Sequence, residues 1–361
     1  MAKTQKHIPW SKYLNKLRRW HRLHLLYGLL ALAAVIGLIS LAAPGRELNE
    51  QTISRDPLRI EFGRLSRELD EFKRTKRKYN ARYIVTNRYI DEKITDIQIN
   101  INSGERQLAD RQIKDTRRQL AVWQEQLARE VALKHPVNNS SLHEAVIPIL
   151  MYHHTPTDFE QQLLTLRQKG YTTITPDRLA AALKAGLPLP GKPAIITFDD
   201  GFADQVVAFE LLKKYQMSAT FYIVNGGEGS QWCIGSGRRY NDPAQPSGGC
   251  GDAYLNWNQV RELDKSGLIT IGAHTIDHAN LAGLSAEQQR AQINGSKAGI
   301  ELELGHPIYH FAYPYGSFTG ETIQIVKEAG FITAVSTIPG SVHARDTLHT
   351  LYRVRDAYSL P

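Results

Sequence analysis

Cysteine is scarce in this sequence, which has only two among its 361 residues, Cys233 and Cys250. They do not form the C-x-x-C pair that many zinc sites use, so a zinc site built on paired cysteines is not expected. Both lie between residues 226 and 252, a stretch rich in glycine, serine, proline and asparagine. In an oxidising compartment a disulfide closing this loop would contribute about 3 kcal/mol. We predict that disulfide, with two free thiols as the alternative.

Acidic residues are absent from residues 1–24, which hold seven of the 44 Lys and Arg residues of the chain. The rest of the chain therefore carries 37 basic and 36 acidic residues, and is nearly neutral although the formal net charge is +8. Basic residues are not concentrated anywhere in that remainder. A nucleic-acid partner is therefore not expected.

Charged residues are also absent from residues 25–43, LLYGLLALAAVIGLISLAA. At about 1.5 Å per residue, these 19 residues nearly match a bilayer core of about 30 Å. They predict a single membrane-spanning helix after a cytoplasmic basic tail, 1–24. The positive-inside rule then places the rest of the chain on the periplasmic or extracellular side of the cell inner membrane. A signal peptide cleaved near Ser40-Leu41-Ala42 and a buried helix of a cytosolic protein are the alternatives.

Proline is rare in residues 45–137, which are rich in charge. Apolar residues recur every seven positions in Ile113, Leu120 and Leu127. This spacing predicts a long amphipathic helix over 105–133, and a weaker pattern of the same kind covers 58–97. We expect a helical stalk that carries the next domain. Its apolar stripe could form a coiled coil with a second chain, giving a homodimer, or the stalk could be a solvated hairpin without a partner.

From residue 146 to the end, at 361, short apolar runs alternate with segments of helical periodicity. The runs are 146–152, 194–198, 218–224, 268–273, 308–313 and 332–338. Several helical segments between them end at a glycine, as helices often do. Alternation of this kind predicts an α/β fold with a parallel sheet, and six or seven units over this length fit a closed or nearly closed (β/α) barrel. Chemistry in such folds belongs at the carboxyl ends of the strands.

Candidate functional residues follow three of these runs. His153 and His154 follow the first run, Asp199 and Asp200 the second, and the segment HTIDH, residues 274–278, the run 268–273. H-x-x-x-H in a helical turn would place two imidazoles on one side, where they could bind one metal ion. With a carboxylate from another strand end, they complete the two-histidine, one-acid set of catalytic zinc sites that keep a position open for water.

The adjacent carboxylates of Asp199 and Asp200 repel each other unless a cation is near. Successive residues at a strand end point to different sides, so one carboxylate can bind the metal while the other faces an activated water. The second carboxylate would then remove a proton from that water. An ordinary Asp-rich turn is the alternative for these two residues.

These residues resemble the polysaccharide deacetylases with a NodB homology domain, carbohydrate esterase family four. The resemblance covers residues 146–355 and rests on three motifs in the family's order: TFDDG at 197–201, HTIDH at 274–278 and FAYPYG at 311–316. It implies a distorted, partly open (β/α) barrel. It also implies that Asp199 is the general base and that the backbone N–H of Tyr315 stabilises the oxyanion. The three metal ligands that it implies are Asp200, His274 and His278. The metal expected is Zn²⁺.

Two departures from the family pattern affect the expected site. Ala312 stands where many members have an arginine that orients the base, and Arg353 is a candidate substitute. The histidine that protonates the leaving amine is not placed by a motif. His153 and His349 are the main candidates, with His343 as a third; each could equally be a structural histidine.

The expected function is metal-dependent removal of N-acetyl groups, which are linear amides, from an amino-sugar polysaccharide outside the cytoplasm. The motif variants are most similar to enzymes acting on poly-β-1,6-N-acetylglucosamine, while peptidoglycan and chitin-like polymers are other possible substrates. An O-acetyl glycan esterase, and a non-catalytic glycan-binding scaffold with a deacetylase-like barrel, are the alternatives. The intact acids and histidines disfavour the scaffold.

Overall fold

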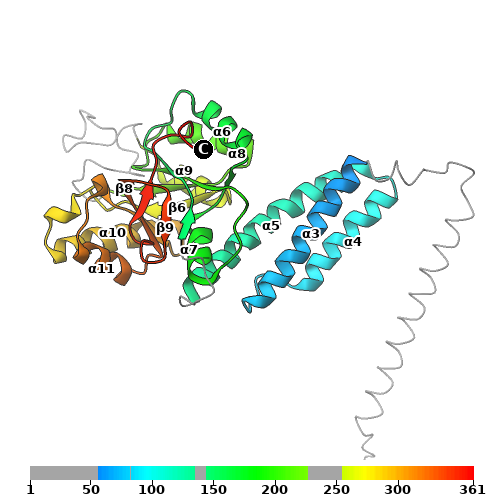
Figure 1. Cartoon of the computed structure of the whole chain (residues 1–361), viewed down its shortest axis with the longest axis horizontal. Coiled ribbons are helices and arrows are strands. Elements are labelled where there is room, and N and C mark those ends of the chain that lie inside the picture. The colour runs from blue at the N-terminus through cyan, green and yellow to red at the C-terminus, as the bar shows by residue number, and fades with distance from the viewer. Residues whose placement is uncertain (1–55, 82, 135–143, 227–253) are drawn as a thin grey trace, which may run out of the picture. The chain divides into compact units, whose positions relative to one another are not determined.

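The computed structural model describes residues 56–81, 83–134, 144–226 and 254–361 (Figure 1). The chain divides into two compact units, residues 1–63 and 64–361. The expected membrane helix, 25–43, and both cysteines lie outside the described residues. Among the helices that are described, none is both long and apolar enough to cross a membrane.

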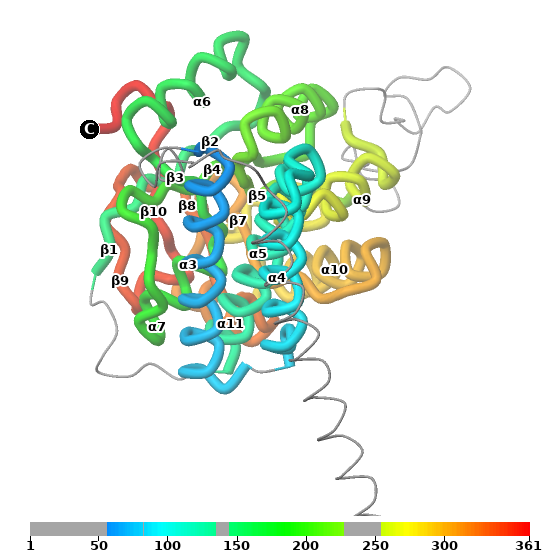
Figure 2. The backbone as a smooth tube through the Cα atoms, turned by 90° about the vertical axis from the view of Figure 1, so that its right-hand side faces the viewer, coloured from blue at the N-terminus to red at the C-terminus, as the bar shows by residue number. Residues whose placement is uncertain are grey.

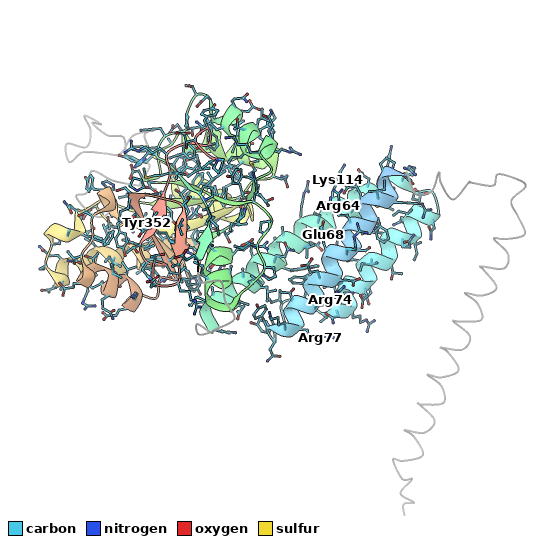
Figure 3. All side chains as sticks on the ribbon, viewed as in Figure 1. Arg64, Glu68, Arg74, Arg77, Lys114 and Tyr352 are labelled. Atoms are coloured by element: carbon cyan, nitrogen blue, oxygen red, sulfur yellow. The ribbon has the colours of Figure 1, made fainter. Side chains whose placement is uncertain are left out.

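In the described part of the chain before the barrel there are three helices: α3 (Pro57–Lys78), α4 (Asn87–Asn102) and α5 (Arg106–Lys134). The long helix expected over 105–133 is therefore present, whereas the weaker pattern over 58–97 is two helices. The second of these begins at Thr86, whose hydroxyl accepts a hydrogen bond from the Tyr89 N–H at 3.2 Å and satisfies one unpaired backbone donor of the first turn. Basic side chains such as Arg74, Arg77 and Lys114 are exposed on these helices (Figure 3).

The apolar stripe of α5 is buried inside this chain. Ile113, Leu120 and Leu127 are each about 2% exposed, and the Trp123 ring stacks on Phe72 of α3 with centroids 6.2 Å apart. The side of α5 that carries Arg129 lies against α7 (Pro176–Ala185). There the Arg129 Nε is 3.1 Å from Asp177 Oδ2. Neighbouring elements of the same chain cover the stripe that suggested a coiled coil.

The second half of the chain forms a parallel sheet that nearly closes into a barrel (Figure 2). Its strands in chain order are β2 (Ile149–Tyr152), β4 (Pro193–Phe198), β5 (Ala219–Ile223), β6 (Ile269–Ala273), β7 (His310–Ala312), β8 (Thr333–Pro339) and β10 (Leu351–Arg353). The spatial order is β10-β8-β7-β6-β5-β4-β2, with β3 (Thr172–Thr173) beside β4.

The two ends of this sheet meet at Val354. Its N–H donates to the Ile149 carbonyl and its carbonyl accepts from the Met151 N–H, both at 2.8 Å, so the segment after β10 joins β2. A short antiparallel pair, β1 (Glu144–Val146) with β9 (Val342–Ala344), lies outside the barrel sheet. The six apolar runs of the sequence each overlap one strand of the barrel, so the α/β barrel prediction is confirmed in its described part.

Helices alternate with the strands and cover the barrel: besides α7 they are α6 (Phe159–Gln168), α8 (Gln205–Tyr215), α9 (Trp257–Lys265), α10 (Ala286–Leu304) and α11 (Gly320–Glu328). Capping boxes begin the last three, at Asn256, Ser285 and Thr319, and such boxes pair otherwise unsatisfied backbone donors. Because every barrel strand runs in the same direction, the loops after the strands gather at one end. Those loops hold the three sequence motifs.

Candidate active site

The loops after β4, β6 and β7 bring the motif residues together at the carboxyl end of the barrel, where β10 ends at Arg353. Asp199 and Asp200 follow β4 directly and are 1% and 5% exposed. Their side chains have different partners: Asp199 contacts Arg353, while Asp200 faces His274 and His278. The two adjacent acids therefore serve two different groups, as the alternation of side chains at a strand end predicts.

Asp199 is held by a bidentate ion pair with a buried arginine. Arg353 Nη1 and Nη2 lie 2.8 and 2.7 Å from Asp199 Oδ1 and Oδ2, and Arg353 is only 2% exposed. Arg353 Nε donates to the Ser336 carbonyl at 2.7 Å, which fixes the guanidinium plane. Burial favours a raised pKa for Asp199, but the charge and hydrogen bonds of Arg353 outweigh it and hold the pKa below its usual value. Arg353 thus supplies the contact that Ala312 cannot make.

A metal ion fits the group formed by Asp200, His274 and His278, whose potential ligand atoms all lie within 4.8 Å of one another. The two Nε2 atoms are 3.4 and 3.3 Å from Asp200 Oδ1. That buried oxygen makes no hydrogen bond within the described residues, which is unusual for a buried carboxylate. Convergence of one such oxygen and two imidazole nitrogens is what a divalent cation such as Zn²⁺ requires.

The surroundings of His274 and His278 favour metal binding. His274 Nδ1 lies 2.8 Å from the carbonyl oxygen of Ala312. Because a carbonyl oxygen only accepts hydrogen bonds, Nδ1 carries a proton and donates it, which leaves Nε2 to bind a metal. Burial, together with the positive charge on His274, lowers the pKa of His278 to about 4. Burial acts against protonation of His274 too, but Asp200 and Asp199 outweigh it and raise its pKa. Both acids therefore attract a positive charge to this position.

The HTIDH segment is a loop and not the helical turn expected from its spacing. Thr275 and His278 have positive φ angles of 67° and 53°, which a helix cannot contain. Gln292 of α10 holds the loop, since its Oε1 accepts the N–H groups of Ile276 and Asp277 at 3.1 Å. The two histidine rings still meet, with centroids 4.9 Å apart.

The FAYPYG segment forms the wall beside His278. Tyr315 has a φ of 58° and its ring meets the His278 ring edge-on, with centroids 4.5 Å apart. Gly316 follows with a φ of 67°, and a Cβ there would lie 2.1 Å from Thr337 Oγ1. Only glycine fits this position, so the backbone that carries the Tyr315 N–H is fixed in place.

The two predicted proton donors lie in different places. His153 Nε2 is 3.9 Å from Asp199 Oδ2 and the side chain is 44% exposed, so it stands at the mouth of the site. His349 lies before β10, and its Nε2 is 2.9 Å from the carbonyl of Phe331, which precedes β8. It is therefore at the opposite end of these strands. His343 is buried against the Ile147 carbonyl at 2.9 Å.

A cleft of about 560 Å³ opens over the site. It is lined by Met151, Tyr152, His153, His154, Tyr315, Thr337 and Arg355. His154 stacks on Phe202 with centroids 4.0 Å apart and lies 3.3 Å from Asp204. The sequence did not single out Arg355 or this ring pair, because neither belongs to one of the three motifs.

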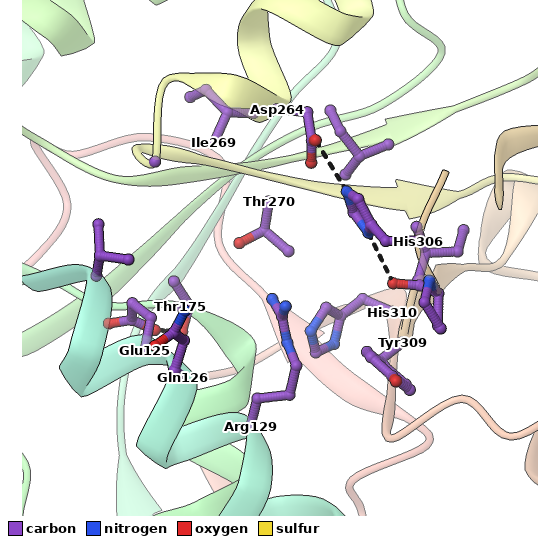
Figure 4. Close-up of a pocket in the computed structure, with 15 residues that line it drawn as sticks. Glu125, Gln126, Arg129, Thr175, Asp264, Ile269, Thr270, His306, Tyr309 and His310 are labelled. Atoms are coloured by element: carbon purple, nitrogen blue, oxygen red, sulfur yellow. Dashed lines mark hydrogen bonds and ion pairs between the residues drawn. The ribbon is translucent and has the colours of Figure 1, made fainter. Parts of the chain in front are cut away.

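A second cavity, of about 320 Å³, lies at the amino ends of the strands (Figure 4). Arg129 and Glu125 of α5 border it, together with His306 and His310. Buried His310 has its Nε2 3.3 Å from Asp177 and its Nδ1 2.9 Å from Thr333 Oγ1. None of the motif residues lines this cavity, so the reaction is not assigned to it.

Comparisons with known proteins agree with the motifs. Residues 186–334 match the family model described as polysaccharide deacetylase. YxkH of Bacillus subtilis (strain 168), whose name places it among polysaccharide deacetylases, is 29% identical over 221 residues, covering 58% of this chain and 71% of that protein. The poly-β-1,6-N-acetyl-D-glucosamine N-deacetylase of Escherichia coli (strain K12) is 24% identical over 205 residues, or 47% of this chain and 29% of that one.

Among solved structures, the Streptococcus pyogenes deacetylase PplD in complex with acetate has a TM-score of 0.48 and 26% identity, covering 58% of this chain and 91% of that one. The matched family region contains Asp199, Asp200, His274 and His278, but ends before Arg353. The family match, the order of the motifs and the geometry of the metal group all make the barrel part of this chain similar to the polysaccharide deacetylase family.

Proposed function

We propose that this protein is a metal-dependent hydrolase that removes N-acetyl groups from an amino-sugar polysaccharide. The observation that carries the proposal is that two adjacent acids contact different groups. Asp200 converges with two imidazoles on one point, and Asp199 is kept ionised beside it by Arg353. An ionised carboxylate that can accept a proton, and a neighbouring metal group, are the two parts that amide hydrolysis by water needs.

The chain supplies a residue for each proton transfer. Asp199 would accept a proton from the attacking water, and Arg353 would hold its carboxylate in position. His153, at the mouth and 3.9 Å from Asp199, would donate a proton to the leaving amine. The Tyr315 N–H would stabilise the negative oxygen of the tetrahedral intermediate. His349 has no part in this scheme, because it lies at the other end of the strands.

Asp200, His274 and His278 would hold the metal. When bound, a divalent metal such as Zn²⁺ lowers the pKa of a water and withdraws charge from the amide carbonyl. The order of the ligands along the chain follows the family, and their burial keeps bulk water from competing with them.

The proposed polymer is one of N-acetylated sugars. Two kinds of relative support this, the Escherichia coli and Staphylococcus aureus proteins named as poly-β-1,6-N-acetyl-D-glucosamine N-deacetylases. The apolar run at 25–43 and the basic residues before it support anchoring in the cell inner membrane, with the barrel outside the cytoplasm. A disulfide between Cys233 and Cys250 is consistent with that compartment.

Acetate release from defined β-1,4 and β-1,6 N-acetylglucosamine oligomers tests the proposal. We expect release that a chelator abolishes and Zn²⁺ restores. Release from O-acetylated glycans alone would favour the esterase. Binding of oligomers without any release, by protein shown to contain metal, would favour the scaffold and contradict the proposal.

A further inference from the structure

The rim of the active-site cleft carries a positive charge for which the reaction scheme has no use. Arg355 is exposed and lines the cleft together with His153 and Tyr315. No acidic residue is among the described residues that line this cleft. Asp199 and Asp200 lie beneath it and are buried. Among the described residues that line the cleft, Arg355 therefore carries the one permanent charge.

The fold explains why Arg355 points to this place. It follows Val354, whose backbone is bonded on both sides to β2, so the chain is held up to that residue. Arg353 is the last residue of β10, and Arg355 stands two residues later, at a bend. The first reaches inward to Asp199, and the second ends in the cleft above it.

No carboxylate within the described residues neutralises Arg355, which has no ion pair there. The adjacent Asp356 is engaged elsewhere, because its Oδ1 accepts the N–H groups of Tyr358 and Ser359 at 2.9 Å. Asp204, the nearest acid to His154, pairs with that histidine and with the Thr155 N–H. The guanidinium is therefore available to the substrate.

We propose that Arg355 makes the cleft select sugar units by charge, favouring neutral or acidic neighbours of the reacting unit over neighbours that already carry an amine. This inference rests on the proposed function, since each deacetylation turns a neutral unit into a cationic one. A product unit beside Arg355 is repelled, while an uncharged one is not. The preferred substrate is then an unmodified run of N-acetylated units, and the product has spaced free amines.

The expected size follows from two unit charges about 6 Å apart in a largely aqueous cleft, which corresponds to about a three- to tenfold preference. Such an effect weakens as salt rises, because exposed charges are screened. A preference based on shape or hydrogen bonding would not weaken in that way.

The test compares two tetramers of N-acetylglucosamine, one fully acetylated and one with a single free amine next to an acetylated unit. The values of kcat/KM per acetyl group are measured, at a pH where the amine is protonated, for the wild type, Arg355→Ala and Arg355→Glu. Lys265→Ala is the matched control, since Lys265 is exposed at the end of α9, before β6, at the opposite end from the motif loops.

We expect the preference for the fully acetylated tetramer to disappear in Arg355→Ala, to invert in Arg355→Glu, and to persist in Lys265→Ala. An unchanged ratio in Arg355→Ala, an equal change in Lys265→Ala, or a ratio insensitive to salt would each overturn the inference. If the wild type releases no acetate, the proposed function fails. The same ratio is then measured as relative binding of the two tetramers by calorimetry, which still tests Arg355.

Discussion

Replacing Arg353 by methionine removes the partner of the proposed base while keeping much of the side-chain volume. Both residues of the pair are at most 2% exposed, and two contacts of 2.7 and 2.8 Å join them. Breaking a buried ion pair from one side costs about 3–5 kcal/mol, because the remaining charge loses its compensation. Asp199 can relieve part of this cost by taking up a proton, so we expect a loss near the lower limit.

The catalytic loss should be larger than the loss of stability suggests. A protonated or displaced Asp199 cannot accept a proton from water, and general bases contribute about 10²- to 10⁴-fold to a rate. We therefore expect acetate release by Arg353→Met to fall by about that factor while the protein still binds metal. Arg353→Lys restores the charge without the two-pronged contact, and should recover only part of the rate.

Arg129→Met is the matched control. Arg129 also pairs with a buried acid, Asp177, but at the amino ends of the strands. It should lower the thermal midpoint and leave kcat of the folded enzyme close to that of the wild type. Thermal unfolding, metal content and acetate release are measured on all three variants.

A double-variant cycle separates positioning from simple destabilisation. If Arg353 acts through Asp199, then adding Arg353→Met to Asp199→Asn should cause little further loss of kcat. Full activity in Arg353→Met, or strictly additive losses in the double variant, would refute the role assigned to this ion pair.

Three further changes test other parts of the structure. Burial raises the pKa of Glu125 to about 7, so the stability that its neutral form allows is lost as pH rises from the ordinary glutamate pKa through 7. Glu125→Gln should therefore raise stability by about 1–2 kcal/mol at pH 8 and by little at pH 5. A gain that is no larger at pH 8 than at pH 5 would contradict this. Gly316→Ala should cost about 1–3 kcal/mol and much of the activity, because its Cβ meets Thr337, whereas Gly320→Ala, which has open space, should not; equal effects would contradict the reasoning. His153→Gln should slow amide cleavage by about 10²-fold but slow an activated ester, whose leaving group needs no proton, much less; equal losses on both substrates would exclude His153 as the acid.

The sequence was informative where periodicity and motif order suffice. All six apolar runs overlap barrel strands, and the residues predicted from three motifs converge at one end of the barrel. Arg353 could be named as a substitute for the missing arginine, because it stands near the last strand and is one of the few cations there. An ion pair such as Asp199 with Arg353 can thus be predicted when both residues stand at the carboxyl ends of parallel strands, since those ends lie together.

The rest depended on backbone conformation and on contacts between distant segments. The HTIDH spacing suggested a helical turn, but the loop uses positive φ angles at Thr275 and His278, which no residue pattern signals for these residue types. His349 looked equivalent to His153 in the sequence, yet it precedes its strand and so lies at the other end. The contact of α5 with α7 depends on packing between segments about 50 residues apart, for example Arg129 with Asp177.

Charge balance connects the buried and exposed ends of the last strand segment. Two acids face one buried cation, Arg353, so the site without metal carries an excess negative charge that the raised pKa of His274 reflects. A divalent metal would change the formal charge of this group from −1 to +1, so the interior would need no further cation. Arg355 is then the cation that the interior does not need, and it lies where the substrate enters. Moving the buried charge from Arg353 to position 312, where many family members have it, would keep the base oriented and leave Arg355 in place. The charge preference of the cleft should therefore be separable from catalysis in this protein.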